Sequence, residues 1–333
     1  MITAERTLSS AMPPVPVAVV TEAGLERELT MVQSAAVSEA AGIFGPESVC
    51  WRIDREAAVF LGAGRALLLQ LAHPWVAAAI IEHSRTLSDP IGRFQRTFNV
   101  TLSMMFGTTS QAFDAARRLH RRHAGVRGNL TESSGAYAAG SAYLANDVAA
   151  LRWVWATLVE TALLAYELIA PPLSAEDRER YYAESRLFAA LFGIPQDALP
   201  QSWADFVGYI DEMVGSQCLA VSREARLVAA ELWAGAGTGW ATPLWYRALT
   251  ARLLPCRLRR DFGLSYGPRE QRSAEWATSV LRRVYPWGPA SLRHVAPYHE
   301  ARARLAGRTR PGALIRVLNR FWIGQSSMAV GGE

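Results

Sequence analysis

Apolar residues recur at three- and four-residue spacing along most of the chain, which is the period of α-helices with one buried face. Runs of alternating β-branched residues, typical of half-buried strands, are missing. Connectors rich in glycine and proline at 192–200 and 235–239 separate neighbouring helical segments. The pattern predicts a nearly all-α fold, with helices over 23–41, 47–61, 63–84, 89–106, 109–124, 145–170, 174–192, 201–215, 221–234, 241–253, 271–284, 290–306 and 311–322.

Composition indicates one large domain. The chain has 333 residues, of which half are apolar and a fifth are charged, so it can bury a sizeable core. We expect a flexible N-terminal arm over 1–20, a single helical domain over 21–325 and a C-terminal tail over 326–333.

The N-terminal segment and the cysteines favour a cytoplasmic location. The first 20 residues lack a basic region, and prolines interrupt their apolar part, unlike an export signal. The three cysteines lie far apart in the sequence, as in proteins of a reducing compartment. No membrane span is predicted, because the apolar run 66–81 is too short and the run 154–170 carries Glu160 and Glu167.

All 35 basic residues are arginines, and the net charge is +5. Without lysine, the chain cannot form the Schiff base of pyridoxal-phosphate enzymes, and it lacks the Gly-Lys-Ser/Thr of a phosphate-binding P-loop. The stretch RRLHRRHAGVR (117–127) combines five arginines with two histidines. It contains no aromatic residue that would stack on a base, so nucleic-acid binding is disfavoured.

His123 in this stretch is predicted to face the core. On a helix it shares one stripe with Phe113, Ala116, Leu119 and Val126, whereas Arg118 and Arg122 point elsewhere. His120 and Arg127 lie at the margin of that stripe. A core histidine bonded to a backbone carbonyl and a ligand of a metal or cofactor would both fit this pattern.

A second polar group lies on the predicted helix over 89–106, which Asp89 is expected to cap. Arg93, Arg96 and Thr97 stand at positions i, i+3 and i+4 and so share one face. Buried guanidinium groups need an anionic partner. That partner is either a protein carboxylate, such as Glu82 or Glu160, or the anion of a cofactor or substrate.

Several other site chemistries are disfavoured by their motifs. Gly62 and Gly64 form a Gly-x-Gly pair, but Leu67 occupies the third glycine position of a dinucleotide-binding turn. The Glu-x-x-His pairs of di-iron sites, the His-Glu-x-x-His of zinc proteases and the glycine-rich cysteine loop of thiolate haem proteins do not occur. An imidazole-ligated haem and a histidine-rich mononuclear site remain, with six histidines available.

The segments GAGRALLLQLAHPWVAAAIIEHS, DPIGRFQRT, LHRRHAGVRG, YYAESRLFAALFGIPQDALP and LPCRLRRDFGL occur in the order and spacing of one family. From about Arg52 to about Arg304, the chain resembles the MpaB-type oxygenases, which share their catalytic domain with rubber oxygenases. This resemblance implies an all-α, globin-like multi-helix domain that encloses a haem b pocket.

The resemblance also implies site residues. An axial histidine in a His-Ala-x-Val-Arg segment corresponds to His123, followed by Arg127, and His120 and Arg93 are assigned with them to cofactor binding. An Arg-x-x-Lys-Thr cluster on the opposite, oxygen-binding side corresponds to Arg93, Arg96 and Thr97, with arginine in place of lysine at Arg96. Glu82 is a further catalytic candidate as a general base, and a salt bridge between Glu82 and Arg93 is the alternative.

The function implied is a haem-dependent oxygenase, or a peroxide-using oxidase, that acts on an apolar small molecule as a monomer or homodimer. Electrons would come from an external donor, or peroxide would serve as the oxidant. Trp155 stands where many relatives have histidine, and the polymer substrate is therefore not carried over. The alternatives are a haem or ligand carrier or sensor without turnover and, in third place, a helical scaffold or membrane-surface protein.

Overall fold

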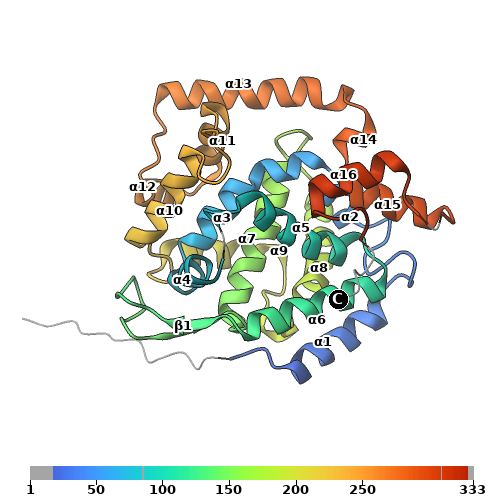
Figure 1. Cartoon of the computed structure of the whole chain (residues 1–333), viewed down its shortest axis with the longest axis horizontal. Helices are drawn as coiled ribbons and strands as arrows, with labels where there is room; N and C mark the ends of the chain where they lie inside the picture. Colours follow the sequence, from blue (N-terminus) through green and yellow to red (C-terminus); the bar gives the residue numbers. More distant parts are fainter. Residues whose placement is uncertain (1–17, 85, 309, 329–333) are drawn as a thin grey trace, which may run out of the picture.

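The computed structural model describes residues 18–84, 86–308 and 310–328, and these residues form sixteen α-helices, three 3₁₀-helices and one two-stranded antiparallel sheet (Figure 1). The prediction of an all-α fold is confirmed. In chain order the elements are α1 (Glu22–Ala35), α2 (Val49–Asp54), η1 (Ala57–Gly62), α3 (Ala63–Leu71), α4 (Pro74–His83), α5 (Pro90–Phe106), α6 (Thr109–Ala124), β1 (Arg127–Asn129), β2 (Ala142–Leu144), α7 (Val148–Tyr166), α8 (Ala175–Ala190), η2 (Gln196–Ala198), α9 (Trp203–Gly215), α10 (Arg223–Ala234), α11 (Leu244–Leu253), α12 (Cys256–Asp261), α13 (Pro268–Val284), η3 (Tyr285–Trp287), α14 (Ala290–Arg293), α15 (Ala296–Leu305) and α16 (Ala313–Ile323).

Side-chain caps fix the helices that matter for the site. Asp89 accepts a hydrogen bond from the backbone N–H of Gly92 at 2.9 Å, and Pro90 takes the first helical position of α5. A capping box between Thr108 and Gln111 opens α6. The positions at which α5 and α6 begin therefore follow from the local sequence, because a cap satisfies backbone donors that have no partner inside the helix.

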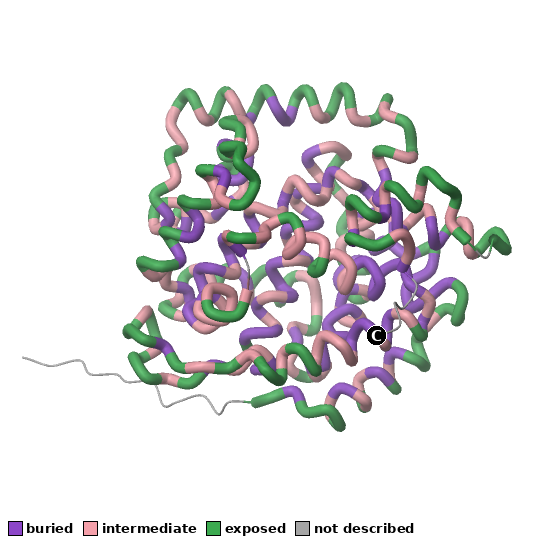
Figure 2. Tube along the Cα trace, in the orientation of Figure 1, coloured by how far each residue is buried: buried purple, intermediate pink, exposed green. Residues whose placement is uncertain are grey.

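The core is built around α7, which runs through the interior and packs against η1, α3 and α8 (Figures 1 and 2). Trp153 and Trp155 on α7 are fully buried. Their indole N–H groups donate to the carbonyls of Leu69 at 2.9 Å and Ser185 at 3.0 Å. Trp155 therefore ties α7 to α8, and each buried indole has its polar atom satisfied.

Proline breaks the helix that the sequence predicts over 63–84. The segment Ala57–Leu71 and α4 meet at an angle of 108°. Pro74 lacks the N–H that would continue the helix, so α3 ends at Leu71 and α4 begins a new direction. The pairing of β1 with β2, through Gly128 and Tyr143, was not predicted either, because three-residue strands show no alternating pattern.

The predicted terminal segments lie partly outside the described residues, which exclude 1–17 and 329–333. Residues 18–20 of the expected arm hydrogen-bond along 146–148, through pairs such as the Val20 N–H and the Asn146 carbonyl at 2.8 Å. In the expected tail, the Met328 N–H donates to Glu300 at 3.1 Å. These contacts attach both ends of the described chain to the helical body.

Within the described residues, α7 is long and apolar enough to cross a membrane, and 61% of its apolar window is buried inside the protein. The bent pair of Ala57–Leu71 and α4 also passes the same test of length and apolarity. The expectation of no membrane span stays a prediction.

Candidate functional site

A cavity of about 630 Å³ lies between one face of each of α4, α5, α6 and α7. Its size falls in the range of pockets that hold small molecules and cofactors, about 300–1,000 Å³. Each helix contributes residues at three- and four-residue spacing, which is how one helix face lines a common space. The lining residues are Gln70, Trp75, Val76, Ala79, Ile80, His83, Ser84, Arg93, Arg96, Thr97, Val100, Thr101, Leu119, Arg122, His123, Val126, Leu144, Ala145, Ala150, Leu151, Val154, Leu158 and Phe192.

His123 borders this cavity near the end of α6. Within the described part of the chain, its ring has no hydrogen-bond partner, and the side chain is half-buried. Burial lowers the pKa of His123 to about 4, and the charges of Arg122 and His120 act in the same direction. The imidazole is therefore neutral at pH 7 and has a free nitrogen lone pair, as a metal ligand requires.

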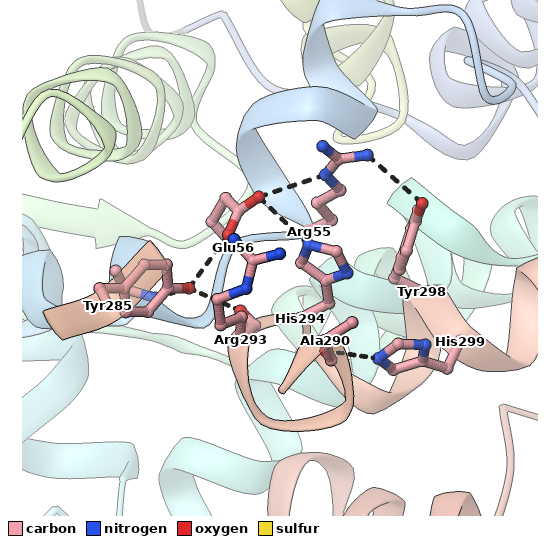
Figure 3. Close-up of polar contacts among 9 residues, drawn as sticks. Arg55, Glu56, Tyr285, Ala290, Arg293, His294, Tyr298 and His299 are labelled. Atoms are coloured by element: carbon pink, nitrogen blue, oxygen red, sulfur yellow. Dashed lines mark hydrogen bonds and ion pairs between the residues drawn. The ribbon is translucent and has the colours of Figure 1, made fainter. Parts of the chain in front are cut away.

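Each of the other histidines contacts a partner through one ring nitrogen. His83 also borders the cavity, and its Nε2 lies 3.0 Å from the Tyr143 hydroxyl. The buried His73 contacts the Tyr137 hydroxyl at 3.1 Å. His294 and His299 lie outside the cavity lining in a polar cluster, where His294 pairs with Glu56 at 3.3 Å (Figure 3). In that cluster Arg55, at 3.2 Å, and Tyr285, at 3.1 Å, also bond Glu56, so its carboxylate has three partners, as expected of a structural ion pair.

Acid is expected to destabilise the protein through its buried histidines. Burial also lowers the pKa of His73 to about 4. Below pH 6.5, His73 and His123 are therefore protonated in the unfolded chain but stay neutral in the folded protein until the pH approaches 4. The stabilisation is complete above pH 6.5 and is lost as the pH falls towards 4, by at most about 3 kcal/mol per histidine. Urea unfolding between pH 7 and 4.5 measures this loss, and a His123→Asn variant should lose less. An equal loss in that variant would show that His123 does not contribute.

Positive charge gathers on the α5 side of the cavity. The Arg93 Nε donates to the Ser84 hydroxyl at 2.9 Å, and within the described residues Arg93 forms no ion pair. Burial and the neighbouring charge of Arg96 lower the pKa of Arg93. Arg96 stands at the mouth, with 45% of its side chain exposed, and pairs with Asp89 at 3.0 Å. None of the described residues that line the cavity is acidic.

The protein carboxylates proposed as partners for Arg93 are bound elsewhere. Glu160 pairs with the buried Arg65 at 2.6 Å. Glu82 accepts a hydrogen bond from the Tyr143 hydroxyl at 2.6 Å. Within the described residues, the guanidinium of Arg93 therefore has no carboxylate partner, and its uncompensated charge favours an anionic occupant of the cavity.

Glu82 does not line the cavity, but hydrogen bonds through Tyr143 connect it to the lining residue His83. The Tyr143 hydroxyl contacts both Glu82 and the cavity residue His83. Burial, together with the Glu82 hydrogen bond and charge, raises the pKa of Tyr143, which keeps the hydroxyl protonated as the donor. Three residues therefore form a hydrogen-bonded chain from the cavity wall to a carboxylate.

Two assigned residues lie away from the cavity lining. The His120 Nε2 lies 2.9 Å from the Val20 carbonyl, so this ring contacts the segment before α1. Arg127 is exposed on β1. Conversely, Arg122 borders the cavity, although the sequence analysis predicted that it points elsewhere, because it stands three residues after Leu119 and therefore lies on the same face of α6. The structure thus brings together His123, Arg93, Arg96 and Thr97, and it adds Arg122 and His83.

Among the described residues, no three or more His, Cys, Asp or Glu side chains gather in a way that would hold a bare metal ion. A haem iron needs only one such side chain from the protein. The donor set around the cavity, the imidazole of His123 with several guanidinium groups, fits that second chemistry.

Comparison with curated proteins and with solved structures gives no significant match. Residues 51–283, more than half of the chain, match the family model described as "ER-bound oxygenase mpaB/B'/Rubber oxygenase, catalytic domain". The matched range contains every residue that lines the cavity. The chain therefore belongs to the family of mpaB/B' and rubber oxygenase catalytic domains and carries an oxygenase domain.

Proposed function

We propose that this protein is a haem b-dependent oxygenase that acts on an apolar small molecule, with His123 as the axial iron ligand. The observation that carries the proposal is the position of the His123 ring, which has no hydrogen-bond partner in the described part of the chain and borders a large cavity without acidic residues among the described lining. A neutral imidazole with a free nitrogen is the usual protein ligand of haem iron.

The cavity walls suit the two parts of a haem. Apolar side chains such as Trp75, Leu119 and Val154 offer a surface for a flat, largely apolar ring. Arg122 forms no hydrogen bond or ion pair within the described chain, so its guanidinium is available for a propionate group. Arg93 supplies further uncompensated positive charge for an anionic cofactor.

A bound haem would supply the redox chemistry that activates oxygen. Arg93 and Arg96 would stabilise negative charge that develops on oxygen as it is reduced, because fixed charges in a cavity need little reorganisation. The Thr97 hydroxyl donates to the Arg93 carbonyl at 3.0 Å and keeps its lone pairs to accept a proton donor from the cavity. The apolar walls would bind the substrate and exclude water.

Glu82 would serve as the proton acceptor of the site. A proton taken up at Nδ1 of His83 would release the proton on Nε2 to the Tyr143 oxygen, which in turn passes its own proton to Glu82. An external electron donor, or peroxide, completes the proposed reaction.

A visible spectrum tests the proposal. The purified protein, or the protein after incubation with haemin, should show a Soret band that shifts on addition of dithionite and again with carbon monoxide. Elemental analysis should find about one iron per chain, since one axial histidine binds one haem. Colourless protein that does not respond to haemin would contradict the proposal.

A further inference from the structure

A second, smaller cavity of about 110 Å³, here called the side chamber, adjoins the main cavity. Thr97 and Thr101 of α5 and Leu158 of α7 line both spaces. The remaining walls of the side chamber are largely apolar and include Phe60, Leu102 and Phe188. The side chamber thus extends from the α5 side of the main cavity, where Arg93 and Thr97 lie, into the interior.

Asp54, the last residue of α2, borders the side chamber. Within the described residues, its carboxyl group forms no hydrogen bond and no ion pair. The neighbouring cations are engaged elsewhere, because Arg52 pairs with Asp177 at 2.7 Å and Arg55 with Glu56 at 3.2 Å (Figure 3). An acidic group with no cation beside it, in apolar surroundings, favours its neutral form.

The described titratable groups that interact electrostatically with Asp54 are all acidic groups, and none is a cation. These groups are Cys50 on α2 and Tyr181 and Glu184 on α8. Burial raises the pKa of Asp54 to about 7, and the charge of Glu184 adds to this shift. Within the described residues, Glu184 forms no hydrogen bond with Asp54 and accepts from the backbone N–H groups of Val49 at 3.2 Å and Cys50 at 2.8 Å.

Within the described residues, the protonated carboxyl of Asp54 carries a hydroxyl donor that forms no hydrogen bond with the chamber walls. The wall hydroxyls of Tyr181 and Ser185 donate to the carbonyls of Val159 at 3.2 Å and Tyr182 at 2.7 Å, and neither forms a hydrogen bond with Asp54. A donor that faces an apolar chamber without a partner is costly, so the unpaired group favours an occupant that supplies an acceptor.

We propose that the side chamber binds the oxygen-bearing end of an otherwise apolar substrate, whose neutral carbonyl, ether or hydroxyl oxygen accepts a hydrogen bond from Asp54. This subsite rests on the proposed function, because the adjoining main cavity is where oxidation would occur. Asp54 is thus a positioning and specificity residue. It selects against pure hydrocarbons, which leave its donor unpaired, and Glu184 disfavours carboxylates.

Two probes of nearly equal shape test the subsite. The affinities of 4-fluoroacetophenone and 1-ethyl-4-fluorobenzene, which differ by a carbonyl group, are measured by ¹⁹F NMR line broadening on the protein as purified. At pH 6 we expect the ketone to bind about tenfold more tightly, the effect of one buried hydrogen bond. At pH 8.5 the ionised Asp54 cannot donate, so this preference should fall to about twofold or less.

Three variants assign the preference to Asp54. Asp54→Asn keeps a donor that does not titrate, so its ketone preference should persist at both pH values. Asp54→Leu removes the donor and should bind both probes equally. Asp211→Asn, which neutralises an exposed carboxylate on α9, should behave like the unchanged protein. A ketone preference that survives in Asp54→Leu, or that does not depend on pH in the unchanged protein, would overturn the proposal.

The binding test is separate from the test of haem binding. If Asp54→Leu fails to fold, the loss of pH dependence in Asp54→Asn still decides the matter. Protein without iron that binds the ketone through Asp54 would contradict the oxygenase mechanism and keep the subsite. Haem-containing protein whose probe affinities do not depend on Asp54 would contradict the subsite and keep the proposed function.

Discussion

Replacing His123 by glycine is expected to abolish the Soret band of the haem-loaded protein, and added imidazole should restore it. His123 is the free imidazole that borders the cavity, so its loss removes the proposed iron ligand and leaves a space that imidazole can enter. Loss of residues that only orient metal ligands costs about 10- to 100-fold in affinity, and loss of the ligand itself should cost at least as much. Haemin titration followed by absorbance measures the effect.

His120→Gly is the matched control for this experiment. His120 lies one helical turn earlier on α6, but its ring contacts the Val20 carbonyl and not the cavity. This variant should bind haemin as the unchanged protein does. A Soret band of normal intensity in His123→Gly, or equal losses in both variants, would mean that the iron ligand has been assigned wrongly.

Replacing Arg93 by methionine is expected to have two opposite effects. The protein without haem should become more stable, by about 1 kcal/mol, because the variant removes a half-buried charge that no carboxylate of the described residues compensates. Its affinity for haemin should fall at least about tenfold, because the cofactor loses a cationic partner. Thermal unfolding measures the first effect, with a rise of about 2–4 °C, and haemin titration measures the second.

Arg121→Met provides the control for net charge. Arg121 is exposed on α6 and does not border the cavity, so its removal should change neither quantity by much. If Arg93→Met were destabilised and bound haemin normally, the guanidinium would be a structural residue and the cavity would need no anion.

The sequence predicted the elements of the site better than their assembly. The cap at Asp89 and the shared face of Arg93, Arg96 and Thr97 follow from α-helical geometry, and all three side chains border the cavity. The inward direction of His123 follows from the same periodicity. Resemblance of the motifs also identified the family, which the match over residues 51–283 confirms.

Partners could not be predicted in the same way. Glu82 was expected either to act as a base or to pair with Arg93, but β2 brings Tyr143 to it, and strands of three residues leave no pattern. His120 was grouped with His123, but the chain before α1 supplies a carbonyl for its ring. Neither contact is encoded within one helix, because each joins residues at least 60 positions apart.

The sequence by itself determined where helices begin, which face of each is apolar, and which polar side chains lie on one face, since these depend on neighbours within about four residues. Only the tertiary structure decided that four such faces meet around one cavity and that Pro74 turns α4 along it. It also decided that Asp54 borders an apolar chamber beside α8 while the arginines on either side of it pair elsewhere. The reason is physical: burial and the pairing of charges depend on which surfaces pack together, and that choice is made by the whole chain.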